Sequence, residues 1–333
     1  KMNKYSKAEN LLRRALTIKE MVLGPEHPSL AKTLMNLANT KQSQGMYDES
    51  RNLFIRAFAI IEKAFGNDHP DTATAANNLA LHYAIDGLQG KAEPLLIRAL
   101  TINEKIFGRD HYNTFASTDN LATFYQLNGE YEKSNFIGNQ SIKIAVKLIQ
   151  REVPFSLVTD RKAFVSQFEN AFKLPFWKEP HNSARAKFAL FSRFNRQGLL
   201  EEIEKRQAQL ASLPGPQQEV AEELRGLTQQ LASMSLNADQ RQNLKSRKEE
   251  LEKQLYRLLP ELEPRIVEVD QVAKAIHSNA VLVEFQRYQP FDGTKPNNER
   301  WDAARYLALV LKPNGQIESV DLGLAEPIED KIQ

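Results

Sequence analysis

The sequence contains no cysteine among its 333 residues. This absence excludes disulfide bonds, thiolate metal sites and a cysteine nucleophile from the chain itself. A strong charge of one sign is also missing, because 44 lysines and arginines face 42 aspartates and glutamates, for a formal net charge of +2. No global field therefore attracts nucleic acid or a membrane surface, and we expect neither as a partner.

Long apolar runs are absent as well. No stretch approaches the roughly 18 to 20 apolar residues that a helix needs to cross a bilayer. The first residues, KMNKYSKAEN, lead into no signal-like apolar core. We therefore expect a cytoplasmic protein. Strand-forming segments are scarce until late in the chain and 26% of the residues are charged, which predicts a mainly α-helical fold.

What the chain does contain is a repeat with a period of 42 residues. Glycine, histidine and an Asn-Leu-Ala triplet each recur three times in step, and so does an Arg-Ala-Leu or Arg-Ala-Phe triplet. The repeated positions are Gly24, Gly66 and Gly108; His27, His69 and His111; the triplets that begin at Asn36, Asn78 and Asn120; and those that begin at Arg14, Arg56 and Arg98. A period of this length is typical of a stacked array, whose units cannot bury their apolar faces alone.

Each period is predicted to form a hairpin of two helices. Residues 70–86 carry apolar side chains at helical spacing. Pro70 lies at the start and Gly87 directly after the end, where helices favour these two residues. Residues 91–107 form the second amphipathic run. Successive hairpins should stack into a right-handed superhelix, an α-solenoid.

Two motifs carry a family resemblance. The pattern N-L-A-x-x-Y-x-x-x-G-x-Y at 120–131, together with the linker R-A-L-x-I-x-E-K-x-x-G-x-D-H at 98–111, resembles bacterial tetratricopeptide repeats of the kinesin-light-chain-like subtype. The resemblance covers residues 1–152 and implies a solenoid that binds a peptide or protein partner. Local departures include Lys41 in place of the tyrosine at positions 83 and 125, and Gly138 at a core position of the last repeat helix.

The resemblance also implies a peptide-binding groove along the first helix of each hairpin. Asn36, Asn78 and Asn120 match the position at which related repeats use an asparagine amide to hold a peptide backbone or carboxylate, and we place Lys32 and Asn77 in the same groove. An amide offers donors and an acceptor, so it can hold an extended main chain without reading its sequence. The alternative is that these asparagines bond only to neighbouring helices. The positions equivalent to Lys32 hold threonine and alanine, which argues against a carboxylate clamp.

The three periodic histidines do not predict a metal site. Zinc requires its ligands within about 2 Å of one ion, whereas equivalent positions of stacked hairpins lie roughly 10 Å or more apart, since packed helices are about 8 to 10 Å from axis to axis. We expect these histidines to make loop hydrogen bonds, and we expect no metal or cofactor in the chain.

Residues 153–265 lose the repeat and form a second predicted domain of connecting helices. Their apolar residues step by 4, 3, 4 and 3 at Val220, Leu224, Leu227, Leu231 and Met234, and Leu244, Leu251, Leu255 and Leu258 continue the pattern. The breaks at 214–216 and 235–237 are short, so we predict an antiparallel coiled-coil hairpin, with a parallel dimer zipper as the alternative. Aromatic residues interleaved with basic ones could stack nucleotides, but a core stripe explains them equally well. The basic residues concerned are Arg185, Lys187, Arg193 and Arg196.

A sheet begins in the third predicted domain, residues 266–333. Residues 280–285 and 305–311 are apolar strand runs, and Asn314-Gly315 predicts a hairpin into a third strand at 316–322. Three strands do not complete a domain. Residues 327–333 suggest a helix that has just begun, and residues 8–24 suggest a second repeat helix without its first. We therefore expect the chain to be a fragment of a larger protein.

These last segments resemble the opening of a CHAT domain, a caspase-like family. The resemblance rests on LVEFQRYQPFD at 282–292, WDAARYLALVLKPNG at 301–315 and DLGLAEPI at 321–328. It implies that the chain is the interaction and regulatory portion of a cysteine peptidase whose catalytic histidine and cysteine lie downstream, so no catalytic residue is expected here. We interpret His277 as a helix-end histidine rather than a base. The alternative is a non-enzymatic scaffold or adaptor with an inactive terminal module.

Overall fold

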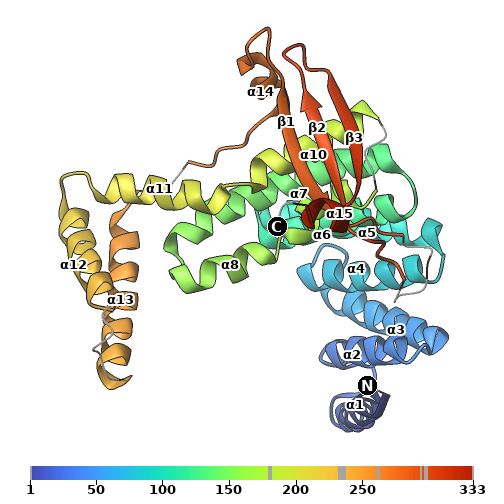
Figure 1. Cartoon of the computed structure of the whole chain (residues 1–333). Coiled ribbons are helices and arrows are strands. Elements are labelled where there is room, and N and C mark those ends of the chain that lie inside the picture. The colour runs from blue at the N-terminus through green and yellow to red at the C-terminus, as the bar shows by residue number, and fades with distance from the viewer. Residues whose placement is uncertain are drawn as a thin grey trace. The chain divides into compact units, whose positions relative to one another are not determined.

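The chain forms two compact units, Lys1–Ile137 and Gly138–Gln333, which are described separately below (Figure 1). They derive from a computed structural model. It describes residues 2–178, 182–231, 238–260, 263–292, 295 and 299–331, with the side chains of residues 2–4 and 238 left aside. The division into domains 1–152, 153–265 and 266–333 remains a prediction.

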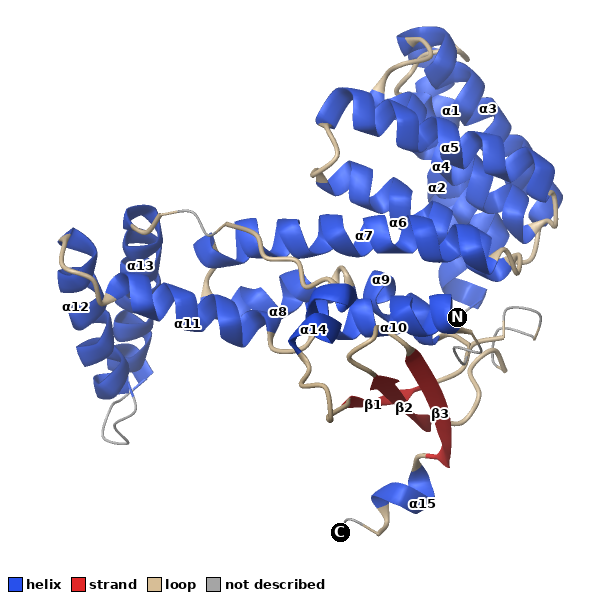
Figure 2. Ribbon diagram, turned by 90° about the horizontal axis from the view of Figure 1, so that it is seen from above, coloured by secondary structure: helices blue, strands red, loops and turns tan. Residues whose placement is uncertain are grey.

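The first unit is a succession of helices, and each of the first six contacts its neighbours along the chain (Figure 2). Its helices are α1 (Met2–Leu23), α2 (Leu30–Ser43), α3 (Tyr47–Phe65), α4 (Pro70–Ile85), α5 (Gln89–Phe107), α6 (Tyr112–Leu127) and the start of α7 (Tyr131–Glu152). The first helices of successive hairpins also meet, since α4 contacts α6. The predicted helical solenoid is confirmed.

Two of the periodic histidines, His69 and His111, cap the helices that follow them, whereas the sequence predicted only hydrogen bonds within the loops. The Nδ1 atoms of His69 and His111 accept hydrogen bonds from the backbone N–H of the second residue of the helix that follows, each at 3.1 Å. Each ring also stacks on the phenylalanine that ends the preceding helix, with 4.5 Å between centroids. The histidines thus satisfy backbone donors that a helix start leaves open. Among the described residues, no group of His, Cys, Asp or Glu is placed to hold a metal ion.

The periodic arginine of the Arg-Ala triplets links each hairpin to the loop before it. Arg56 donates to the carbonyl oxygen of Pro25 at 3.0 Å and pairs with Glu20 at 2.7 Å. One period later, Arg98 donates to the backbone carbonyl oxygen of Asn67 at 3.4 Å and to its side-chain Oδ1 at 3.1 Å, and pairs with Glu62 at 2.7 Å. A guanidinium can make both contacts at once because its donors are fixed in a planar fork.

Lys41 replaces an aromatic residue without losing the junction that the aromatic residue makes. At the equivalent position two periods later, the hydroxyl of Tyr125 donates to Glu93 at 2.8 Å. Lys41 is 4% exposed, and its ammonium lies 2.7 Å from Glu9 and 3.1 Å from Glu49. Its hydrogen bond, and after it that of Arg13, lowers the pKa of Glu9 to about 2. Position 41 therefore still donates to a glutamate of the preceding helix, α1.

The second unit combines helices with a small sheet. It comprises the rest of α7, α8 (Val158–Ser166), α9 (Glu169–Lys173), α10 (Ser183–Arg196), α11 (Leu199–Ala211), α12 (Pro216–Leu231), α13 (Ala238–Leu258), α14 (Val269–Ala275), α15 (Glu326–Glu329), the 3-10 turns η1 (Val153–Phe155) and η2 (Leu174–Phe176), and the strands β1 (Leu282–Tyr288), β2 (Arg305–Leu311) and β3 (Ile317–Leu324). Mainly helical segments and three late strands are what the sequence predicted.

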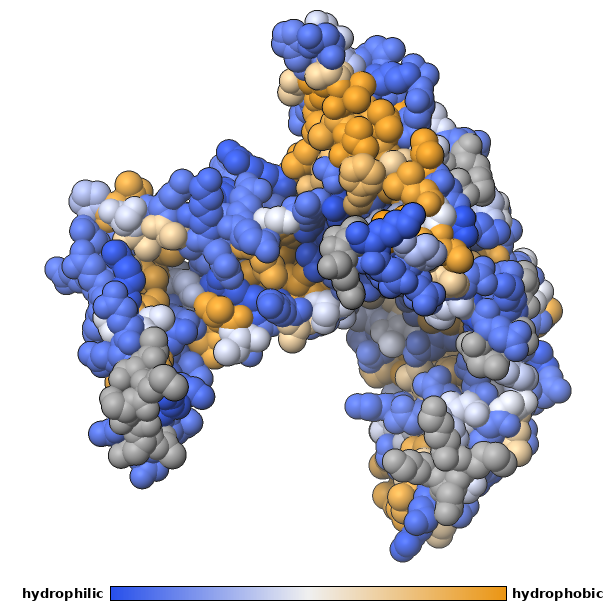
Figure 3. All heavy atoms as spheres, viewed as in Figure 1, coloured by the Kyte–Doolittle hydropathy of each residue, from blue (hydrophilic) through white to orange (hydrophobic). Residues whose placement is uncertain are grey.

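The sheet is antiparallel in the order β1-β2-β3, with α10 against one face (Figure 2). Arg193 of α10 contacts Glu284 at 3.2 Å and Gln286 at 3.1 Å. The opposite face is apolar and open among the described residues, and Figure 3 shows the apolar surface over the strands. Its exposed side chains include Val283, Phe285, Val320 and Leu322.

The bounds of the strands differ slightly from the predicted ones. The first strand begins at Leu282 and continues to Tyr288, because Tyr288 still pairs with Arg305 across the sheet. The hairpin at Asn314-Gly315 is present, with Gly315 at φ 82°. A positive φ suits glycine, so this turn follows from the sequence.

Helices α12 and α13 lie antiparallel, as predicted for this hairpin. Arg241, near the start of α13, donates to the carbonyl of Leu231 at the end of α12, at 3.2 Å. Further along, Arg247 pairs with Glu223 at 2.8 Å. The apolar seam between them includes Val220, Leu227, Leu251 and Leu255, with Leu224, Leu231 and Leu244 against it. Coiled-coil packing remains a prediction; Met234 and the break at 235–237 lie outside the described residues.

Gly138 lets two helices of the second unit approach closely. It lies in α7, and a Cβ atom at this position would overlap the ring of Phe188 from α10. Phe188 is 1% exposed and belongs to the core. The glycine that departs from the repeat pattern therefore provides the space that a large aromatic ring fills.

We expect Gly138→Ala to lower the free energy of unfolding by about 1 to 3 kcal/mol, because the added methyl group overpacks the Phe188 ring. The matched control is Gly226→Ala in α12, where a Cβ atom meets nothing within 4 Å. This control should stabilise the chain by about 1 kcal/mol, since alanine favours a helix over glycine. Thermal unfolding followed by circular dichroism measures both. Equal melting temperatures for Gly138→Ala and wild type would contradict the close packing.

We expect the stabilising effect of Glu9 to depend on pH. Because the folded-state pKa lies below the unfolded value of 4.5, the contribution is present above pH 4.5 and is lost as the pH falls toward 2. Denaturant unfolding of wild type and Glu9→Gln should differ by up to about 3 kcal/mol at pH 6, and this difference should vanish near pH 2. Glu26→Gln is the control: its pair with Lys63 is exposed and should have little effect at any pH. A constant difference across this range would refute the ion-pair account.

Candidate peptide-binding surface of the repeats

The five predicted groove residues lie on three successive first helices. Lys32 and Asn36 are exposed on α2, Asn77 and Asn78 are half-buried on α4, and Asn120 is half-buried on α6. We call this set the repeat groove. The 42-residue period places equivalent residues on neighbouring helices, which explains why one face carries an amide on each.

Two of these amides bond directly to each other. The Nδ2 atom of Asn120 donates to Oδ1 of Asn77 at 3.0 Å, so the pair joins α6 to α4. The side-chain NH2 group of Asn77 and the side-chain Oδ1 of Asn120 make no hydrogen bond among the described residues. The pair therefore retains an unused donor and an unused acceptor, the two kinds of group that can bond to a peptide unit.

The other two asparagines differ in their surroundings. Asn78 donates to the sulfur of Met35 at 3.3 Å, which joins α4 to α2. The side chain of Asn36 makes no hydrogen bond within the described part of the chain. Bonds to neighbouring helices, the alternative to peptide binding, thus occupy one donor each of Asn78 and Asn120. Peptide binding by the repeat groove stays a prediction.

A cavity of about 460 Å³ opens at one end of the repeat groove, between the start of α2, the end of α3 and the start of α4. Lys32 forms part of its wall, and Asp71 faces the same space. The sequence did not single out its apolar lining. The lining residues are Pro28, Ser29, Ala31, Lys32, Met35, Ile61, Phe65, Asp71 and Thr74. One signal was available: Thr74 is the period equivalent of Lys32, so both had to fall on this face.

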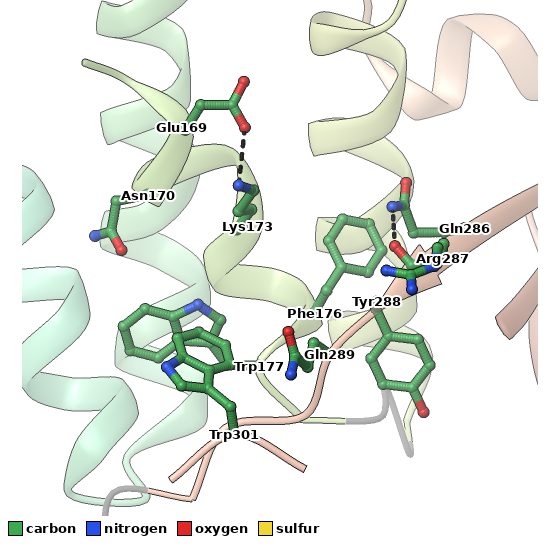
Figure 4. A pocket seen from close by; sticks show the side chains of 10 residues that line it. All are labelled: Glu169, Asn170, Lys173, Phe176, Trp177, Gln286, Arg287, Tyr288, Gln289 and Trp301. Carbon is green, nitrogen blue, oxygen red and sulfur yellow. Dashed lines mark hydrogen bonds and ion pairs between the residues drawn. The ribbon is translucent and has the colours of Figure 1, made fainter. Parts of the chain in front are cut away.

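A second cavity, of about 600 Å³, lies within the second unit (Figure 4). Figure 4 shows Trp177 and Trp301 on one side of it and Phe176 and Tyr288 on the other. The polar lining residues are Glu169, Asn170, Lys173, Gln286, Arg287 and Gln289. No sequence pattern predicted a site at these residues, because they come from two segments more than a hundred residues apart with no shared motif.

One wall of this second cavity carries an ion-paired carboxylate. Burial raises the pKa of Glu169, but the hydrogen bond and the charge of Arg196 outweigh it, so the pKa lies below its ordinary value. Arg196 lies 2.6 Å and Lys173 3.4 Å from the carboxylate. Glu169 is therefore charged and paired, which suits a structural role better than that of a general base.

The basic residues considered for nucleic acid have partners of their own. Arg185 is 4% exposed and donates to the carbonyl of Leu174 at 2.8 Å. Lys187 lies 2.7 Å from Asp270, and Arg193 and Arg196 bond to the glutamates named above. These side chains do not form a free basic patch. Separately, none of the described helices is long and apolar enough to cross a membrane.

Comparison with known proteins agrees with the repeat geometry. Residues 29–105 match a family model of the tetratricopeptide repeat, and residues 1–29 match another model of the same repeat. No curated protein matches the sequence.

Two solved structures are similar in fold. Nearly identical TPR-like repeats named for a Podosopora anserina kinesin light chain share 23% identity, cover 62% of this chain and 89% of that one, and give a TM-score of 0.41. BtubC (BKLC) from P. vanneervenii shares 20% identity, with 64% and 77% covered and a TM-score of 0.43. At these scores neither structure bears on function. The repeat models, which span residues 1–105, establish that this chain contains tetratricopeptide repeats.

Proposed function

We propose that this chain binds a protein partner through its repeats, and that an extended segment of the partner lies along the repeat groove. Tetratricopeptide repeats are protein-interaction modules, which supports the general statement. The repeat groove, with its amides on α2, α4 and α6, supports the more specific one.

The observation that carries this proposal is the pair formed by Asn77 and Asn120. Their mutual hydrogen bond of 3.0 Å fixes both side chains and leaves a donor and an acceptor open. A partner's main chain carries the matching carbonyl and N–H at every residue, so the pair would hold it whatever its sequence. The energetic cost of ordering the two side chains is already met in the free protein.

The cavity beside Lys32 adds side-chain selectivity to this backbone recognition. Its apolar lining of Met35, Ile61 and Phe65 suits an apolar side chain, and its volume of about 460 Å³ holds one of any size. Lys32 and Asp71 at the wall would orient a polar end. A single lysine does not make a carboxylate clamp, so we propose an internal peptide segment rather than a free C-terminus.

We further propose that the chain is the interaction and regulatory portion of a CHAT-family, caspase-like protein. The support is the resemblance of segments 282–292, 301–315 and 321–328, together with the order of parts: repeats, connecting helices, then strands. In the full protein, a histidine-activated thiolate would attack a peptide carbonyl. This chain has no cysteine and contributes no catalytic residue.

A non-enzymatic scaffold is the second candidate. It is favoured by the fact that the motifs of this chain serve packing or binding. The reading frame of the complete gene product distinguishes the two. The peptidase requires a histidine and a cysteine, each directly after a β-strand beyond residue 333, and a complete protein without them is a scaffold.

We expect alanine substitutions in the repeat groove to weaken peptide binding. The probe is a fluorescein-labelled 12-residue peptide selected from a displayed library on the whole chain, and fluorescence anisotropy gives its affinity. Asn77→Ala and Asn120→Ala should each weaken binding by up to about tenfold, because each removes one hydrogen bond and the support of its partner. Lys32→Ala should act through the cavity.

The matched control is Asn10→Ala, an exposed asparagine of α1 away from the repeat groove, which should bind the probe as wild type does. Selected peptides that bind all three groove variants with unchanged affinity would show that the partner lies elsewhere on the repeats. Circular dichroism of each variant separates lost binding from lost folding.

A further inference from the structure

Outside the repeat groove, the second unit holds one stretch of chain through contacts to its backbone. Residues 263–268 lie between α13 and α14 and form neither helix nor strand. In Figure 1 they are part of an outstretched trace that leads into α14. Pro264 and the β-branched residues Ile266 and Val267 favour such an extended backbone. We call residues 263–268 the strap.

The first of these contacts is made by Gln150 of α7. Its Nε2 atom donates to the carbonyl oxygen of Arg265 at 2.9 Å, and the backbone N–H of Arg265 donates back to Oε1. One side-chain amide thus bonds both main-chain polar groups of a single residue, as a residue of a neighbouring strand does in an antiparallel sheet. Gln150 is 3% exposed, so its amide lies almost entirely out of water.

Asn195 of α10 makes the same contact two residues further along the strap. Its Nδ2 atom donates to the carbonyl oxygen of Val267, and the N–H of Val267 donates to Oδ1, both at 2.9 Å. A further bond, from Nδ2 to the carbonyl of Phe191 at 2.8 Å, fixes the orientation of the amide. Residues two apart on an extended chain present their polar groups to the same edge. We call Gln150 and Asn195 the amide clamp; Asn195 is also 3% exposed.

The side chains of the strap contribute less than its backbone. Arg265 is 71% exposed and lies 3.3 Å from Glu202, and Glu268 lies 2.6 Å from Lys143 with both side chains exposed. Exposed ion pairs of this kind stabilise a structure little. The two apolar residues between them are half-buried. The amide clamp therefore holds groups that every peptide carries, largely without reading the sequence.

The burial of the clamp determines what could replace the strap. If the strap left, two amides that are almost completely buried would lose their partners, which is unfavourable unless another group bonds to them. A second extended main chain has N–H and C=O groups at the same spacing, so it can satisfy both amides at once. Exchange for another peptide segment is therefore the favoured way to vacate the clamp.

We propose that the amide clamp is a binding site for an extended peptide main chain and that the strap is its removable occupant. The ligand is a peptide segment that lies extended and presents the N–H and C=O groups of two residues two apart. Its binding displaces the strap and frees the stretch of chain between α13 and α14. The site shares no residue with the repeat groove, so this inference is independent of the proposed function.

The test uses a fluorescein-labelled peptide of residues 263–269, EPRIVEV, and two N-methylated versions of it. One version carries methyl groups on the backbone nitrogens of residues 265 and 267, which removes the donors to the clamp. The other carries them on residues 266 and 268, whose N–H groups have no partner among the described residues. The two versions have the same side chains and differ only in which edge of the chain is blocked.

The receptor is the whole chain with Arg265→Pro and Val267→Pro, because proline suits an extended backbone but cannot donate to the clamp. We expect this release variant to bind the labelled peptide at least tenfold more tightly than wild type, in which the tethered strap competes at a high local concentration. Adding Asn195→Ala should weaken binding about tenfold, since two hydrogen bonds are lost. The peptide methylated at 266 and 268 should bind, and the one methylated at 265 and 267 should not.

A second measurement uses the wild-type chain and does not depend on the folding of any variant. Hydrogen–deuterium exchange at single-residue resolution should be slow at the N–H groups of residues 265 and 267 and fast at 266 and 268, because only the first two donate to the clamp. A large excess of unlabelled peptide should speed exchange at 265 and 267, because it displaces the strap. Asn120→Ala, the groove variant, should show the same acceleration.

Three results would overturn the inference. The first is the absence of saturable binding to a release variant whose circular dichroism matches that of wild type. The second is equal binding of the two methylated peptides, which would mean that side chains rather than the main chain are recognised. The third is exchange at residues 265 and 267 that the excess of peptide leaves unchanged, which would make the strap a permanent part of the fold.

Discussion

The first unit depends on one constraint: each helix can bury its apolar side only against another helix. A single helix of the array cannot bury its own apolar side chains, so each is buried at a contact between two helices, which we call a junction. The contrast between Ile18, which is 52% exposed, and Ile102, which is 2% exposed, shows this directly, because the two residues occupy equivalent positions. Stability in such an array therefore accumulates junction by junction.

Polar contacts keep these apolar junctions in register. Arg56 and Arg98 link α3 and α5 to the preceding loops, and the donors at positions 41 and 125 link α2 to α1 and α6 to α5. Lysine and tyrosine are chemically different, yet both bring a donor to a glutamate at the same place. The geometry of the junction, rather than the identity of the side chain, is what the repeat maintains. The same junctions place Asn77 beside Asn120.

The second unit follows other rules, because it has no period to build on. Its core holds large aromatic residues, and Gly138 provides room for Phe188 between α7 and α10. The sheet packs on α10 through one face and presents an apolar surface on the other.

The sequence alone determined the helical solenoid, the late strands and the glycine turn at 315. Each of these depends on a local pattern, a period or a residue-specific backbone preference, which neighbouring residues carry in full. The sequence also predicts that five side chains line one groove, and this stays a prediction.

Only the tertiary structure decided which of those side chains meet. Asn120 bonds to Asn77 rather than to Asn78, because the offset between the stacked helices determines which asparagine is within reach. No local sequence pattern encodes this offset. The cavity between Trp177 and Tyr288 has the same origin: its walls come from distant segments that only the packing of the second unit brings together. Periodicity predicts which helix faces are equivalent. Which side chains on them make contact depends on how the helices and the sheet pack against one another.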